Sequence, residues 1–374
     1  MKKILFGSLA VAGLLSFAQA EFDPYGHLGL YGETNTSDNK KDYAGLSASV
    51  GFNLYGGGFS FGLGGWAAIP IYENTKKNAD NIYKDMFVLS EAYFAYDSKP
   101  FGITLGRYDT NKMGYEWFSG HNEGVSLRFG IGNFMNIWAL YSYEQAFQFQ
   151  RVNRETASQI NALWNYERYK DKSHLAATGI DLFFGDVFTI SPYAYFLTRQ
   201  FVAPGVTLDL LLGKKNDLYS QTQFKYTFID GVSGSLVSSG QLFLIDQEFG
   251  YDWFKIGGGY YKTTGGGLGS LTSYGDSSRF YGSMVGVAST VGTGFHNKVG
   301  YFTGKQSTWY AFMGARHNVF KFDLLYANGG YKELSALLSF VLFNHLEFGA
   351  GYIDLANTQG NKRNYVTGFV KAIW

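Results

Sequence analysis

Polar and apolar side chains alternate along most of this chain. In residues 46–54 every second side chain is apolar, and serine, glycine and asparagine occupy the positions between. Residues 221–228 and 345–352 repeat the pattern. Since successive side chains of a strand point to opposite faces of a sheet, each segment predicts a strand with one apolar and one polar face.

About eighteen such segments of roughly ten residues follow one another, which is the even number and length typical of a bacterial outer-membrane barrel. Short turns separate some segments, and long polar loops separate others at residues 70–85, 110–120, 144–173 and 263–306. We therefore predict an all-β fold, a single transmembrane antiparallel β-barrel with short periplasmic turns and long external loops. Counts of about 20 strands, with two more in residues 279–303, or about 16 are the alternatives. Pro192 falls inside one predicted strand, where we expect a bulge because proline cannot donate to the ladder.

Both ends of the chain carry signals of their own. Lys2 and Lys3 precede an apolar stretch, and Ala18-Gln19-Ala20 then gives the small-x-small pattern of a cleavage site. Residues 1–20 therefore predict a signal peptide cleaved near Ala20, and residues 21–374 form the barrel. The chain ends in Trp374 at the close of an alternating segment, which resembles the signal read by the barrel-assembly machinery.

Composition narrows the class of protein further. Glycine occurs 49 times, whereas average usage would give roughly 26. There is no cysteine, which excludes a disulfide scaffold and a cysteine nucleophile. A net charge of +1 gives no reason to expect a nucleic-acid partner. The six histidines lack metal-binding spacing, so we expect no metal, no cofactor and no enzymatic activity.

Three short stretches, residues 91–93, 105–107 and 123–127, are similar to the same region of OprD-type specific porins, the outer-membrane carboxylate channels. Residues 118–125 resemble the Hof-type outer-membrane family of epsilonproteobacteria more closely still. The OprD-type resemblance implies an eighteen-stranded monomeric barrel, narrowed by an inward-folded third loop and a seventh loop. It also implies a ladder of basic residues that guides anionic or amino-acid-like solutes. By our count, residues 110–120 are the third external loop and residues 263–306 the seventh.

Strand parity predicts which charged side chains face the lumen, because a charge facing lipid is costly. The predicted basic side of the pore consists of Arg128, Arg199, Lys225, Lys255, Arg316 and Lys321. The predicted acidic side consists of Glu91, Glu123, Asp181, Asp209 and Asp323. Such rows select ions in a water-filled pore; alternatively, these charges only solvate the lumen or pair with one another. In the third loop we expect the constriction at Tyr115, Glu116, Trp117 and His121.

These features predict an outer-membrane porin that allows small hydrophilic solutes to diffuse through a charged lumen. The alternative is a surface adhesin or receptor that acts through its long external loops. Expected partners are outer-membrane lipid, lipopolysaccharide, the assembly machinery and small solutes, and the chain could work as a monomer or a trimer. Residues 33–37 resemble the acidic bacterial N-glycosylation sequon, with Asn35 as the acceptor.

Overall fold

The computed structural model describes most of the chain. The described residues are 20–36, 42–73, 87–118, 120–146, 166–169, 172–274, 279–280, 301–302, 304–357 and 362–374. The predicted signal peptide, apart from its last residue, lies outside this part of the chain.

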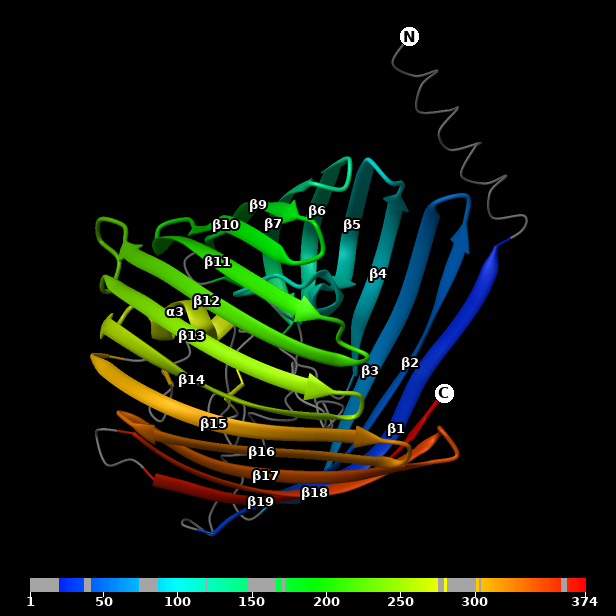
Figure 1. The fold of residues 1–374 in the computed structure, drawn as a ribbon. Helices are drawn as coiled ribbons and strands as arrows, with labels where there is room; N and C mark the ends of the chain where they lie inside the picture. Colours follow the sequence, from blue (N-terminus) through cyan, green and yellow to red (C-terminus); the bar gives the residue numbers. More distant parts are fainter. Residues whose placement is uncertain are drawn as a thin grey trace.

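Antiparallel strands form a closed wall around a common interior (Figure 1). Each strand pairs with the next along the chain, and the first pairs with the last. The wall strands are β1 (Glu21–Asn35), β2 (Tyr43–Gly56), β3 (Phe59–Glu73), β4 (Phe87–Asp97), β5 (Phe101–Asp109), β6 (His121–Ile131), β7 (Met135–Ala146), β9 (Leu175–Phe184), β10 (Phe188–Leu197), β11 (Phe201–Gly213), β12 (Leu218–Gly231), β13 (Gly240–Tyr251), β14 (Phe254–Gly265), β15 (Gln306–His317), β16 (Phe320–Gly329), β17 (Tyr331–Leu342), β18 (Leu346–Asn357) and β19 (Lys362–Ile373).

The described wall therefore has eighteen strands, which confirms the predicted fold and count. The short strand β8 (Glu167–Arg168) pairs with the outer end of β7, while β7 also pairs directly with β9. β14 pairs directly with β15. Most of residues 279–303, for which two more strands were the alternative, lie outside the described residues. None of the helices in the described ranges has the length and apolar character of a membrane span.

The two faces of the wall follow the alternation of the sequence. In β13, Phe243, Ile245 and Phe249 are 42%, 41% and 53% exposed, whereas Leu244 and Asp246 between them are buried. The exposed apolar side chains form the surface that lipid covers in a membrane barrel, and the buried ones face the interior. Large exposed aromatic side chains lie near both strand ends, with Trp253 and Trp374 at the short-turn end and Trp309 at the other.

The last residue of the chain takes part in barrel closure. Gly26 and Trp374 exchange two backbone hydrogen bonds, of 3.0 and 3.2 Å, between N and O atoms. A Cβ atom at position 26 would lie 2.6 Å from the Trp374 ring, so glycine leaves the space that this ring occupies.

Pro192 lies within β10 without a bulge. The β9–β10 ladder skips this position and resumes in the same register, with Ile190 opposite Leu182 and Tyr193 opposite Gly179. The predicted bulge is therefore wrong: the exposed proline leaves a gap in the ladder, and the register is unchanged.

Candidate solute pathway

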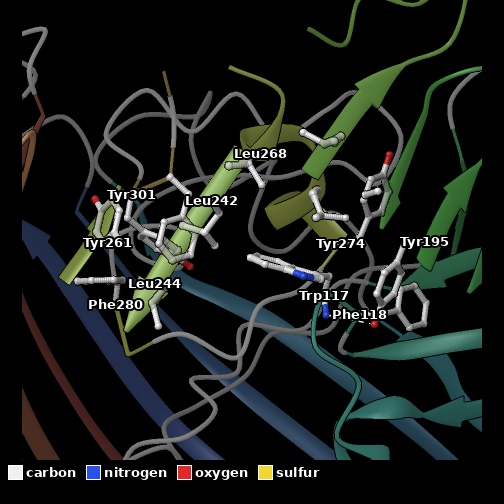
Figure 2. Close-up of a cluster of buried hydrophobic side chains, with 14 of the residues drawn as sticks. Trp117, Phe118, Tyr195, Leu242, Leu244, Tyr261, Leu268, Tyr274, Phe280 and Tyr301 are labelled. Atoms are coloured by element: carbon white, nitrogen blue, oxygen red, sulfur yellow. Dashed lines mark hydrogen bonds between the residues drawn. The ribbon is translucent and has the colours of Figure 1, made fainter. Parts of the chain in front are cut away.

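The third external loop, loop three (residues 110–120), turns back into the barrel. The backbone N–H and the hydroxyl of Thr110 both donate to the Gly120 carbonyl oxygen, at 2.8 and 2.7 Å, which brings the two ends of the loop together. Trp117 is fully buried, and its indole Nε1–H donates to the Tyr193 hydroxyl at 2.9 Å. Its backbone N–H donates to the Tyr195 hydroxyl at 3.3 Å. Both tyrosines belong to β10, so the loop reaches the inner face of this strand. Figure 2 shows Trp117 beside Tyr195.

An ion pair fixes the same loop to β12. The Lys225 side chain, 3% exposed, contacts the Glu116 carboxylate, and its Nζ lies 5.5 Å from the Trp117 ring centroid. Thr207 also donates to Glu116, at 3.4 Å. A predicted wall residue and a predicted constriction residue thus neutralise each other.

Tyr115 lies in loop three, whereas His121 is the first residue of β6 and not part of the loop. The Tyr115 hydroxyl is 2.5 Å from the Ser126 hydroxyl, and its ring lies 4.9 Å from that of Trp138. Burial raises the pKa of Tyr115 above its ordinary value. His121, 2% exposed, has its Nε2 atom 3.4 Å from the Glu91 carboxylate.

A cavity of about 740 Å³ lies beside loop three, against the inner wall from β3 to β12. Six of the predicted site residues line it, namely Glu91, Tyr115, Glu116, Arg128, Asp181 and Asp209. Arg128 forms an ion pair there with Asp97, which also lines the cavity.

The seventh external loop, loop seven (residues 266–305), is also folded inward over its described parts. The helix α3 (Leu268–Leu271) buries both its leucines, and Phe302 contacts Trp117 of loop three with ring centroids 6.1 Å apart. Figure 2 shows this aromatic cluster, in which residues of both loops meet the wall strands. Phe280 packs edge-on against Tyr310, with centroids 5.1 Å apart.

Arg279 of loop seven holds a pair of wall carboxylates that the sequence analysis missed. It donates two hydrogen bonds of 2.9 Å to Asp246 and one of 2.7 Å to Glu248. Both carboxylates lie on β13, on the inward parity that the alternation of this segment indicates. The alternation of polar and apolar residues could have identified Asp246 and Glu248 as inward-facing. Arg279 could not be found in this way, because it lies in a loop without periodicity.

Comparison with known proteins identifies the family. A sequence family described as "Putative outer membrane protein" matches residues 30–330. The chain belongs to this family. It is therefore an outer-membrane protein, as the sequence predicted.

Solved structures of this fold come from the OprD and Occ proteins. The chain resembles OccAB4 of Acinetobacter baumannii, with a TM-score of 0.68, 11% identity and coverage of 95% of this chain and 99% of that one. OccK3 (OpdO) of Pseudomonas aeruginosa gives a TM-score of 0.69 at 10% identity, covering 98% and 99%. OprD of Pseudomonas aeruginosa gives 0.64 at 13% identity, covering 96% and 98%. These matches confirm the OprD-type resemblance as one of fold, and a search of curated proteins finds no match.

Within this outer-membrane family member, two predicted pore residues lie away from the lumen. Arg199 has φ of +65° in the exposed turn between β10 and β11, so it is not on a strand face. Glu123 shares the outward parity of Leu127 and forms a 2.7 Å ion pair with Arg107 at the outer end of the wall. We predicted that Glu123 and Arg128 both face the lumen. They are an odd number of positions apart on β6, so their side chains point to opposite faces, and Arg128 is the one that faces inward.

The remaining predicted pore residues lie on inward positions at the short-turn half of β14 to β16. They are Lys255, Arg316, Lys321 and Asp323. Lys321 contacts one oxygen of the fully buried Glu347 at 3.0 Å, and Lys371 contacts the other at 3.4 Å. These contacts link β16 and β19 to β18 by their charges.

Proposed function

We propose that this outer-membrane barrel is a porin through which small hydrophilic solutes diffuse. The observation that carries the proposal is the cavity of about 740 Å³ inside the closed wall, lined by charged and aromatic side chains. A ligand-sized space with a few convergent polar groups is the usual form of a small-molecule site. Loop three, with Tyr115 and Glu116 on the cavity surface, acts as the constriction.

Charged side chains on the lumen wall set the preference among solutes. Arg128, Asp181 and Asp209 project from three neighbouring parts of the wall into the same space. Fixed charges beside a narrow water-filled passage favour ions of the opposite sign. The likeness of fold to the solved OprD and Occ structures supports the proposal.

Single-channel recording of the refolded barrel in a planar bilayer tests this function. Discrete current steps that vary linearly with voltage are expected, and heat-unfolded protein from the same preparation is the control. A barrel that migrates as folded on a gel but carries no current contradicts the porin proposal. That result would favour a surface receptor acting through its external loops, of which large parts lie outside the described residues.

The maturation, partners and assembly of the chain belong to the same proposal. Residues 1–20 are removed near Ala20, Trp374 engages the assembly machinery, and the outward face contacts lipid and lipopolysaccharide. The barrel catalyses no reaction and works as a monomer or a trimer. Intact mass of the protein from outer membranes tests the cleavage site and any glycan on Asn35, the last residue of β1. Light scattering of the purified barrel decides the number of subunits.

A further inference from the structure

The cavity beside loop three has an unbalanced set of charges. Among the described residues that line it, six are acidic and one, Arg128, is basic. The acidic residues are Glu91, Asp97, Asp109, Glu116, Asp181 and Asp209. We infer that this cavity binds organic cations that carry amine or guanidinium groups and need no carboxylate, and that Asp181 and Asp209 determine this specificity. The inference deepens the proposed function and rests on it where permeation is concerned.

The basic groups at this cavity are already neutralised. Arg128 forms its ion pair with Asp97, and Lys225 forms one with Glu116. An anionic solute would have to displace these carboxylates from their partners. The ladder of basic residues that guides anions, which the OprD-type resemblance implies, is therefore not available to a solute in this cavity.

Among the described residues, the hydrogen-bonding partners of Asp181 and Asp209 are neutral. Asp209 accepts from the side-chain amides of Gln221 and Gln223, at 2.5 and 3.4 Å. Asp181 interacts with Ser191, a residue of the same cavity lining. Amide and hydroxyl donors orient a carboxylate without cancelling its charge, so the two aspartates present negative charge to the cavity.

A buried hydroxyl supports a polar ligand in the same space. Tyr108 lines the cavity and is 2% exposed. Its hydroxyl oxygen lies near Asn122 and Ser126 yet meets hydrogen-bond geometry with neither. A buried polar group without such a bond is destabilising, so the wall of the cavity at Tyr108 favours a polar ligand over an apolar one.

Aromatic side chains complete the cavity. The rings of Tyr115 and Trp138 pack together with centroids 4.9 Å apart, and Tyr93 and Tyr193 also line the space. Aromatic faces attract ammonium and guanidinium groups. Together with the two aspartates, they provide the chemistry that recognises a cation with an aliphatic body.

Two measurements on the full barrel test the inference. Calorimetric titration with putrescine, a diamine without a carboxylate, measures binding in detergent. Reversal potentials in a potassium chloride gradient measure ion preference in a bilayer. The test variant is Asp181→Asn with Asp209→Asn. The matched control is Asp186→Asn with Asp217→Asn, which removes the same charge from two exposed turns.

We expect the wild-type barrel to bind putrescine and to prefer potassium over chloride. The test variant should weaken putrescine binding by roughly tenfold per aspartate, the scale of about one charge-assisted contact, and should lower the potassium preference. The control should match the wild type. Chloride preference in the wild type, or equal putrescine binding in the wild type and the test variant, overturns the inference. The sign of the ion preference of the wild-type barrel tests the inference even if the variant does not refold.

The two proposals fail in different ways. A barrel that binds putrescine but carries no current retains the cation cavity and refutes the porin. A barrel that conducts without cation preference and does not bind putrescine retains the porin and refutes the cavity's specificity.

Discussion

Arg279 fastens loop seven to the inner wall, and its removal should release the loop. The guanidinium bonds to Asp246 and Glu248 and lies 3.6 Å from the Phe312 ring centroid. Burial alone would lower the pKa of Arg279, but the hydrogen bonds and charges of the two carboxylates raise it above its ordinary value. The side chain therefore stays charged at any pH of the experiment.

The cost of Arg279→Ala follows from what the substitution leaves behind. The side chains of Asp246 and Glu248 are 10% and 8% exposed and lose their shared cation. Removing one partner of a buried ion pair costs about 3–5 kcal/mol. The Tyr310 and Tyr219 hydroxyls still donate to these carboxylates, so we take the lower value. About 3 kcal/mol raises the fraction of barrels with an undocked loop by roughly 100-fold.

Hydrogen exchange at α3 measures that fraction. The Ser270 N–H donates to the Gly267 carbonyl oxygen at 2.9 Å inside the folded loop. If the loop undocks as a unit, exchange of this amide should speed up by the same factor in Arg279→Ala. Arg279→Lys should give an intermediate exchange rate, because lysine keeps the positive charge but lacks the planar guanidinium that bonds to both carboxylates. Lys262→Ala, at an exposed position of β14, is the control.

The result that would refute this reasoning is an unchanged exchange rate in Arg279→Ala. It would mean that aromatic packing alone holds the described parts of loop seven. A faster rate in the Lys262→Ala control as well would show that the effect does not depend on the ion pairs.

Three further predictions concern the other loop, the last residue and a glycine. Lys225→Met removes the ion pair that fixes Glu116 of loop three to β12. Because the loop should then move more, current noise through the channel should increase, and noise equal to that of the wild type would contradict the anchoring role. Trp374→Ala should slow barrel folding by purified assembly machinery, measured as the gel shift of the folded form; folding at the wild-type rate would remove the assembly role. Gly62→Ala places a Cβ atom 2.1 Å from the Tyr93 ring, which should destabilise the barrel by about 1–3 kcal/mol in urea unfolding. Gly368→Ala, where the nearest atom is 3.7 Å away, should leave the midpoint unchanged, and equal effects at both glycines would refute the steric argument.

Strand positions and faces could be read from the sequence because they depend on local geometry. A strand turns each successive side chain to the opposite face, so the alternation in residues 46–54 is visible without any partner. The same rule put Lys225 and Asp209 on inward positions. The prediction failed at Glu123, which we assigned to the wrong face of its strand. It also failed at Arg199, which lies in a turn, where side chains do not alternate between two faces.

Contacts made by the loops could not be read in this way. Loop three and loop seven have no periodicity, and their anchors lie far away in the sequence: Glu116 meets Lys225, and Arg279 meets Asp246. These pairs exist because the closed wall brings distant segments to one interior. The sequence determined a barrel with a charged inner face, through a repeat of two residues. Only the tertiary structure decided which charges neutralise each other and which remain to meet a solute, because that depends on how the loops fold back into the lumen.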